Sequence, residues 1–112
     1  CVRKVMARND SEGIIITHGT DTLQYTAALL SYVFGTDCVP VLLVSSDFPL
    51  EDERANGMAN FMRAVEFIKC REGRGVFVSY RYLPRNEAVD ASALFCKALP
   101  VRWSFFSWKS VL

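Results

Sequence analysis

Residues 13–23 read GIIITHGTDTL and combine an apolar β-branched run, a tight turn and the start of a helix. The run Ile14–Thr17 has no polar alternation, which is typical of a strand buried on both faces of a parallel sheet. The turn then brings an imidazole, a hydroxyl and a carboxylate together within four residues. Ligands bind outside the carboxyl ends of parallel strands, so this turn is the first candidate for a functional site.

A helix is predicted to follow the turn, over residues 22–34. Its apolar residues repeat at helical spacing: Leu23, Ala27, Leu30 and Phe34, with Leu29 and Val33 widening the stripe. Thr20 or Asp21 is a natural N-cap, and Gln24 follows Asp21 by three residues, as in a capping box. Gly35 suits the left-handed position at which helices commonly end.

The alternation of strand and helix continues downstream. Residues 39–44 predict a second buried strand, residues 55–70 a helix, and residues 76–80 a third strand. The helix is expected to bury its larger apolar residues, which are Met58, Phe61, Met62, Val65 and Ile68. This order implies right-handed crossovers, and therefore an α/β fold with three layers (αβα) around a mainly parallel, Rossmann-like or flavodoxin-like sheet.

The alternating pattern ends at about residue 82. Residues 90–98 are compatible with a short helix capped by Asp90 and stopped before Pro100. Residues 101–108 hold both tryptophans and are compatible with a strand. We therefore divide the chain into an α/β part, residues 1–82, and a divergent C-terminal segment, residues 83–112.

Composition limits the classes of partner. The net charge is +1 and the basic residues are scattered among acidic ones, which argues against a nucleic-acid partner. No run reaches the roughly 18 apolar residues that span a membrane, and no secretory signal is visible, so we expect a cytoplasmic protein. No glycine-rich phosphate-binding pattern occurs.

The four cysteines are widely spaced and accompany a single histidine: Cys1, Cys38, Cys70, Cys96 and His18. Metal sites usually show close ligand pairs, so this spacing predicts free thiols in a reducing compartment and no metal. His18 is expected to pack with a ring nitrogen bonded to a backbone carbonyl, although an acid or base role near pH 7 is the alternative.

On spacing alone, Thr20 and Asp21 are more typical of a helix cap than of a catalytic pair. A threonine hydroxyl is a weak nucleophile that needs a base or a polarising neighbour. A carboxylate beside it can relay a proton or bind a cationic group. Both residues lie where helix N–H groups gather, a place that suits an oxyanion.

The unbroken run from Gly13 to Leu23 resembles the second signature of the L-asparaginase family, an apolar strand followed by His-Gly-Thr-Asp-Thr. Similarity continues at Thr26-Ala27, Pro40 to Val44, Pro49, Asn56-Gly57, Asn60, Ala64 and Gly75 to Val78. The resemblance implies threonine-centred hydrolysis of L-asparagine to L-aspartate and ammonia, without metal or cofactor. It also implies a homodimer or homotetramer for the full-length parent.

The resemblance implies roles for particular residues. Thr20 would belong to the threonine apparatus that attacks or activates the side-chain amide. Asp21 would bind the α-amino group of the substrate and couple to a lysine, for which Lys97 is only the nearest downstream candidate. Gly19 and Ser46 would help to bind the substrate, Ser46 through backbone contacts.

Other parts of the family pattern have no counterpart in these residues: a second catalytic threonine in a Gly-rich turn, an Asp-Ser pair and a smaller C-terminal domain. We therefore expect an incomplete domain, a fragment of an amidohydrolase that is inactive alone. One alternative is an inactive α/β remnant or a non-catalytic binding module in which Thr20 and Asp21 only cap the helix. Another is the asparaginase-like subunit of a tRNA-dependent amidotransferase.

Overall fold

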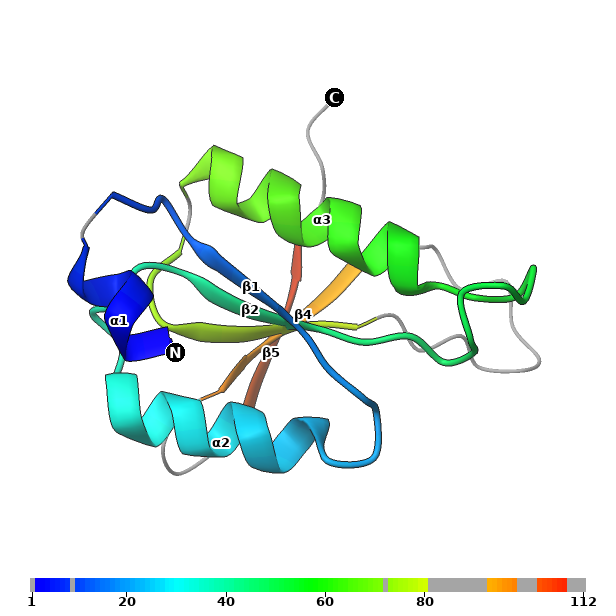
Figure 1. The fold of residues 1–112 in the computed structure, drawn as a ribbon, viewed down its shortest axis with the longest axis horizontal. Coiled ribbons are helices and arrows are strands. Elements are labelled where there is room, and N and C mark those ends of the chain that lie inside the picture. The colour runs from blue at the N-terminus through cyan, green and yellow to red at the C-terminus, as the bar shows by residue number, and fades with distance from the viewer. Residues whose placement is uncertain (1, 9, 72, 81–92, 99–102, 109–112) are drawn as a thin grey trace.

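The computed structural model describes residues 2–8, 10–71 and 73–80 in full and the backbone of residues 93–98 and 103–108. The elements in chain order are α1 (Val2–Ala7), β1 (Ile14–Thr17), α2 (Leu23–Phe34), β2 (Val41–Val44), α3 (Gly57–Cys70), β3 (Val76–Ser79), β4 (Ala93–Ala98) and β5 (Trp103–Trp108). The five strands form one sheet in the order β1-β2-β3-β4-β5. Figure 1 shows α2 and α3 on opposite faces of this sheet, which confirms the predicted three-layer α/β architecture.

The first three strands are parallel and in simple register. Ile14 lies beside Val41 and Val41 beside Val76, while Thr17 lies beside Val44 and Val44 beside Ser79. Because the three strands run in the same direction, their carboxyl ends meet at one edge of the sheet. The residues that directly follow β1 and β2 therefore emerge as neighbours at that edge.

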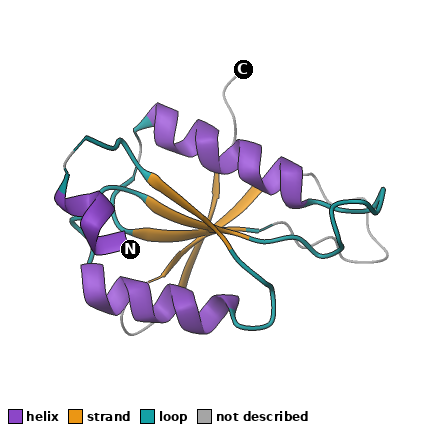
Figure 2. Cartoon of the chain, viewed as in Figure 1, coloured by secondary structure: helices purple, strands orange, loops and turns teal. Residues whose placement is uncertain are grey.

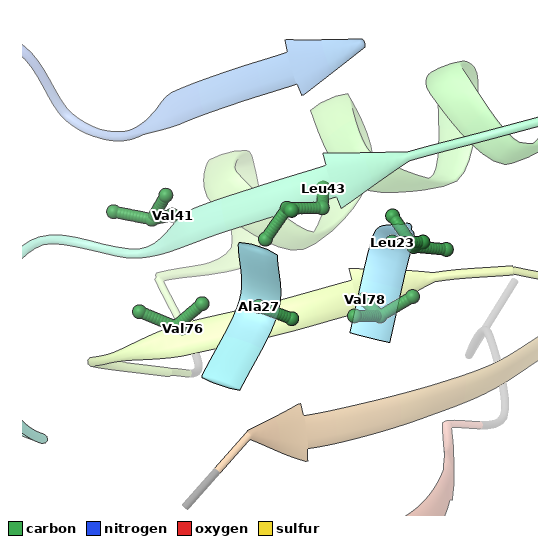
Figure 3. Packing of buried hydrophobic residues seen from close by; sticks show 6 residues of the cluster. All are labelled: Leu23, Ala27, Val41, Leu43, Val76 and Val78. Atoms are coloured by element: carbon green, nitrogen blue, oxygen red, sulfur yellow. The ribbon is translucent and has the colours of Figure 1, made fainter. Parts of the chain in front are cut away.

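Side chains of β2 and β3 alternate between two hydrophobic cores, as the pleat of a strand requires. The core under α2 contains Leu23, Ala27, Val41, Leu43, Val76 and Val78, and Figure 3 shows these side chains between the helix and the two strands. The core under α3 contains Leu42, Val44, Ala64, Phe67 and Phe77. Both central strands are buried along their whole length, because each face of the sheet is covered by a helix.

The prediction for the buried face of α3 was wrong for Met58, Phe61 and Met62, which are exposed, whereas Ile68 packs against the core. The helix buries Gly57, Asn60, Ala64 and Phe67 and turns its methionines outward, with Met58 65% and Met62 51% exposed. Both sets recur at helical spacing, so periodicity alone does not separate them. Gly57 faces inward because the first turn of the helix lies close to the loop that follows β2: a Cβ on Gly57 would lie 2.8 Å from Cβ of Ser46.

Two further expectations about burial need correction. β1 is half-buried where burial on both faces was expected, because within the described residues it pairs only with β2 and forms the edge of the sheet. On α2, Leu23 and Ala27 are buried as predicted, but Leu29 and Val33 are exposed and do not widen the core stripe. Gly35 ends α2 with a φ of 67°, as expected for a left-handed terminal residue.

The last part of the chain also departs from the prediction. Residues 93–98, expected within a short helix, form strand β4, which pairs with β3 in antiparallel fashion. A sheet partner outweighs the local helix signal here. The strand expected within residues 101–108 is confirmed over the described residues as β5, Trp103–Trp108. The proposed cap Asp90 and stop Pro100 lie outside the described residues, and the division at residue 82 stays a prediction.

Within the described part of the chain, Cys38 and Cys70 are free thiols, as expected. Cys38 is half-buried, and burial raises the pKa of its thiol above the ordinary value. No helix among the described residues is long and apolar enough to cross a lipid bilayer. The same residues contain no cluster of three or more potential metal ligands.

Candidate active site

Two connections leave the carboxyl edge of the parallel strands. The first is the short turn of residues 18–22 between β1 and α2, and the second is the longer loop of residues 45–56 between β2 and α3. Figure 2 shows both loops leaving the sheet at the same end. The predicted site residues are divided between them: Gly19, Thr20 and Asp21 lie on the turn and Ser46 on the loop.

The ring of His18 forms hydrogen bonds that hold the turn. Its Nδ1 lies 2.7 Å from the carbonyl oxygen of Gly19, and its Nε2 lies 2.9 Å from the hydroxyl oxygen of Thr26 on α2. A carbonyl only accepts, so Nδ1 carries the proton; in the tautomer with Nδ1 alone protonated, the Thr26 hydroxyl donates to Nε2. The expectation of a packed histidine bonded to a backbone carbonyl is confirmed.

Thr20 and Asp21 do not cap α2, contrary to the reading from spacing. The N-cap is Thr22, whose carbonyl accepts from Thr26 N–H at 3.1 Å and whose side chain makes no capping hydrogen bond. Gln24 donates to the backbone carbonyl of Asp21 at 3.3 Å, so the capping box is absent. The side chains of Thr20 and Asp21 are exposed and bond no other residue in the part of the chain that the structure describes.

Ser46 uses its hydroxyl to fix the loop that follows β2. The hydroxyl donates to the Phe48 carbonyl at 2.7 Å and accepts from the Gly57 N–H at 3.1 Å. One side chain thereby closes the start of the loop onto the first turn of α3. The hydroxyl thus uses its proton and one of its lone pairs within the loop.

Asp47 and Asn56 clamp the two ends of the same loop together. Asn56 Oδ1 accepts from the Asp47 N–H at 2.9 Å, and Asn56 Nδ2 donates to Asp47 Oδ2 at 2.7 Å. The other carboxylate oxygen of Asp47 accepts from the hydroxyl of Tyr80, the residue that follows β3. The clamp therefore links the loop to the ends of two strands.

A buried asparagine lies beneath this clamp. Asn60 is 1% exposed, and its Nδ2 donates to the Ser45 carbonyl at 2.9 Å. The backbone carbonyl of Asn60 accepts from the Ser79 hydroxyl at 2.9 Å. Asn60 thus joins α3 to the carboxyl ends of both β2 and β3, a bridging role that sequence reasoning missed. The signal available was a pair of asparagines four residues apart, at the start of a helix that follows a buried strand.

A cavity of about 340 Å³ opens at the carboxyl edge between the turn and α3. Its lining is mostly apolar and consists of Thr17, His18, Val44, Ser45, Ser46, Leu50, Gly57, Met58 and Phe61. The structure therefore brings Ser46 together with the residues that lead into the turn. Gly19, Thr20 and Asp21 lie next to His18 along the chain but do not line the cavity.

The tip of the loop has an exposed ion pair. Arg54 Nη2 lies 2.6 Å from Asp52 Oδ2, and its guanidinium stacks 4.2 Å from the centre of the Phe48 ring. The hydrogen bonds from Arg54 lower the pKa of the Asp52 carboxyl to about 2. This pair adds a further tie within a loop that is already fastened at both ends.

The chain matches the family model described as asparaginase, N-terminal, over residues 1–83. It is 47% identical over 74 residues to a glutamyl-tRNA(Gln) amidotransferase subunit from Methanococcus vannielii, covering 62% of this chain and 16% of that protein. It is 36% identical over 75 residues to the L-asparaginase of Thermococcus kodakarensis, covering 66% of this chain and 22% of that protein.

A solved structure, L-asparaginase I from Vibrio cholerae, has a TM-score of 0.59 and 26% identity, covering 94% of this chain and 36% of that chain. The chain therefore spans between 16% and 36% of the length of these three relatives. The family model covers well over half of the 112 residues. This chain belongs to the asparaginase family and carries part of its N-terminal α/β domain.

Proposed function

We propose that this chain is a segment of an L-asparaginase-type amidohydrolase that converts L-asparagine and water to L-aspartate and ammonia. Thr20 supplies the hydroxyl that attacks or activates the side-chain amide. Asp21 binds the α-amino group, because a carboxylate pairs with an ammonium ion. Neither step calls for a metal or a cofactor.

The main support for the proposal is that the turn carries the family signature while its two polar side chains make no bond within the described residues. Thr20 and Asp21 belong to an unbroken family signature, yet no described residue bonds their side chains. Neither side chain caps α2, so helix capping does not explain why a threonine and an aspartate lie here. Two exposed polar groups at the carboxyl edge of a parallel sheet are available for a ligand.

Ser46 and Gly19 complete the proposed substrate contacts with their backbones. The Ser46 hydroxyl is held by Phe48 and Gly57, so the peptide groups around it keep a fixed position at the cavity wall. Fixed N–H groups stabilise developing negative charge without reorganising during the reaction. Gly19 leaves the space beside the turn open, because a Cβ added there would meet no atom within 4 Å.

The 112-residue chain is expected to release little ammonia by itself. Within the described residues no base lies in hydrogen-bond contact with the Thr20 hydroxyl, and threonine attacks poorly without one. In the whole protein we propose a homodimer or homotetramer in the cytoplasm, acting on a small-molecule substrate. The free thiols of Cys38 and Cys70 agree with a reducing compartment.

The proposal is tested by grafting the turn, together with β1, β2 and β3, into a complete relative. Residues 13–80 replace the matching segment of the Thermococcus kodakarensis L-asparaginase, and ammonia release from L-asparagine is measured. We expect turnover by the chimera and a loss of roughly 10³-fold or more in kcat for Thr20→Ala, as for removal of a reacting group. Asp21→Ala is expected to abolish turnover.

The chain offers a matched control in a second Thr-Asp pair. Thr36 and Asp37 lie between α2 and β2, at the amino edge of the sheet, and both are exposed. Thr36→Ala and Asp37→Ala are expected to keep the rate of the chimera. Normal rates in the Thr20 and Asp21 variants, or equal losses in the control pair, would reject the assigned roles.

A second candidate function is favoured by the 47% identity to the amidotransferase chain of Methanococcus vannielii. Here the same turn would release ammonia for transfer to tRNA-linked glutamate. The segment is placed in that archaeal protein, and ammonia release is compared with and without charged tRNA and the other chain of the amidotransferase. Release that requires both supports this candidate, whereas release from free L-asparagine alone supports the first.

A further inference from the structure

The β2–α3 loop ends in a chemically reactive dipeptide, Asn56-Gly57. The backbone nitrogen of the residue after an asparagine can attack the side-chain amide, and glycine obstructs this attack least because it has no Cβ. Of the four asparagines in the chain, only Asn56 is followed by glycine. The fold uses both members of the pair: Asn56 bonds Asp47 at the other end of the loop, and a Cβ on Gly57 would lie 2.8 Å from Ser46 Cβ.

The folded loop holds this reaction back in three ways. Asn56 has a ψ of 0°, which places the Gly57 nitrogen in line with the backbone nitrogen of Asn56 and away from its side chain. The Gly57 N–H donates to the Ser46 hydroxyl at 3.1 Å. The Asn56 amide is bonded to Asp47, and Asn56 is only 8% exposed. Attack therefore needs rotation about the Asn56 Cα–C bond, which in turn needs local opening of the loop.

We propose that Asn56 is a self-modification site at which deamidation releases the β2–α3 loop. The Gly57 nitrogen loses its proton and forms a bond to Asn56 Cγ, the bond from Cγ to Nδ2 breaks, and Nδ2 leaves as ammonia with that proton. Water then opens the five-membered imide at either carbonyl, which gives aspartate or isoaspartate at position 56. One water enters, one ammonia leaves, and no group changes oxidation state. The reaction is independent of the proposed amidohydrolase, because it uses only water and groups of the chain itself.

Loss of the amide turns the contact between the two ends of the loop from attractive to repulsive. Asn56 Nδ2 donates to Asp47 Oδ2 at 2.7 Å, and in the aspartate product an oxygen takes the place of that nitrogen. Two carboxylates then face each other at hydrogen-bond distance, where like charges disfavour one another. In the isoaspartate product the main chain gains a carbon atom, which displaces the carbonyl that accepts from the Asn60 N–H in the first turn of α3. Both products therefore loosen the loop, and the departure of ammonia makes the change irreversible.

Deamidation rates test the protection. The 112-residue chain is incubated at mildly alkaline pH, folded in buffer and unfolded in urea, and deamidation at each asparagine is followed by peptide mass spectrometry. We expect Asn56 to deamidate at least roughly tenfold more slowly in the folded chain, since the loop must first open. In the unfolded chain Asn56 is expected to react fastest of the four asparagines. Equal rates at Asn56 in the two states would overturn the proposed protection by the fold.

Two aspartates of the same loop separate the contact with Asn56 from loop opening in general. Asp47→Ala removes the partner of the Asn56 amide and is expected to speed deamidation of the folded chain at least about fivefold. Asp52→Ala removes only the exposed pair with Arg54 at the tip of the loop and is expected to leave the rate within about twofold. Circular dichroism checks that both variants are folded. Equal rates in the two variants contradict the role of Asp47.

Asn56→Asp reproduces the aspartate product. Arg54 is exposed in the loop and Arg8 is exposed outside it, so trypsin cleavage after each of them compares release of the loop with unfolding of the whole chain. We expect cleavage after Arg54 to be at least roughly fivefold faster than in the unmodified chain and cleavage after Arg8 to be unchanged. Gln24→Glu, the same amide-to-acid change in an exposed position, is the control and is expected to change neither. Unchanged cleavage after Arg54, or an equal rise at both sites, contradicts release of the loop.

Exchange of the two side chains tests charge repulsion as the cause. In the double variant Asp47→Asn, Asn56→Asp, an amide again faces a carboxylate, and the backbone N–H at position 47 and the Tyr80 hydroxyl keep oxygen acceptors. Resistance to cleavage after Arg54 is expected to return to within about twofold of the unmodified chain. A double variant that is cleaved as fast as Asn56→Asp would show that the paired carboxylates do not release the loop.

Discussion

The two loops at the carboxyl edge of the sheet are built in opposite ways. The β2–α3 loop is tied by Ser46, Asp47, Asn56 and Asn60 to a helix and to two strands. In the β1–α2 turn the ring of His18 bonds the Gly19 carbonyl and the Gln24 side chain bonds the Asp21 carbonyl, but no described residue bonds the side chains of Thr20 and Asp21. One loop uses its polar groups to hold the fold, and the other leaves them available.

This difference separates two kinds of polar residue that look alike in a sequence. A polar side chain that is buried and bonded stabilises the fold, and its loss leaves an unsatisfied partner. A polar side chain that is exposed and unbonded contributes little to stability, so its loss is not expected to unfold the chain. The β2–α3 loop belongs to the first kind and the turn to the second.

The largest effect is expected from Asn60→Ala. The substitution removes the donor to the Ser45 carbonyl and leaves that buried group unpaired, which costs about 2–3 kcal/mol of the free energy of unfolding. Urea denaturation measures the loss. Gln24 is the control, because its amide also donates to a carbonyl, that of Asp21, but in an exposed position. Gln24→Ala is expected to stay within about 0.5 kcal/mol, and similar losses at both positions would show that Asn60 is not a bridge.

Glycine substitutions compare the two loops directly. A Cβ on Gly57 meets Ser46 Cβ at 2.8 Å and Leu50 Cδ2 at 2.9 Å, so Gly57→Ala forces the tied loop to shift. We expect a net loss of about 1 kcal/mol, since overpacking exceeds the gain in helix propensity. Gly19→Ala on the turn meets nothing within 4 Å and is expected to be nearly neutral. Thermal unfolding of the two variants in parallel tests the contrast, and the reverse order would contradict it.

The hydrogen bond between Thr26 and His18 predicts a smaller effect. Thr26→Val removes the donor to His18 Nε2 at a cost of about 1 kcal/mol, and the ring nitrogen shifts measured by NMR should change. Thr26→Ser keeps the hydroxyl and is expected to preserve those shifts. Unchanged ring nitrogen shifts in Thr26→Val would mean that this bond does not hold the histidine.

The smallest effect is electrostatic and lies at the tip of the tied loop. Arg54 holds the pKa of Asp52 at about 2, below its ordinary 3.8. Because the folded pKa is depressed, the contribution of this pair to stability is complete above about pH 4 and disappears as the pH falls through about 2. Arg54→Ala is expected to return the pKa of Asp52 toward 3.8 in an NMR titration. Arg71→Ala, which removes the separate pair with Glu12, should leave it unchanged.

The architecture could be predicted because local signals and tertiary packing agree over residues 14–79. Short, mostly apolar runs form the three parallel strands, and the stripe of Leu23 and Ala27 faces the sheet. The prediction failed where the two disagree. On α3, hydrophobicity favoured Met58 and Met62, but the helix buries Gly57, Asn60, Ala64 and Phe67 instead. In β4, pairing with β3 outweighed a local helix signal.

The candidate site was predictable only in part, for a similar reason. Thr20 and Asp21 were found by their family signature, since spacing alone favoured a helix cap that the structure does not contain. The bridging role of Asn60 was missed although Asn60 lies within the family similarity and four residues after Asn56, because neither signal shows which groups its side chain bonds. Its role depends on Ser45 and Ser79, which are distant along the chain and meet it only in the fold.

The edge position of β1 has a consequence for amide hydrogen exchange. The N–H groups of Ile14 and His18 donate to carbonyls of Pro40 and Val44 beside them, at 2.8 and 2.9 Å. Alternation along the strand therefore turns the N–H groups of Ile15 and Thr17 away from β2. Those two amides should exchange with solvent deuterium far faster than their neighbours. Any strand that docks along β1 would slow both together, which makes this pair of amides a built-in reporter of pairing at this edge.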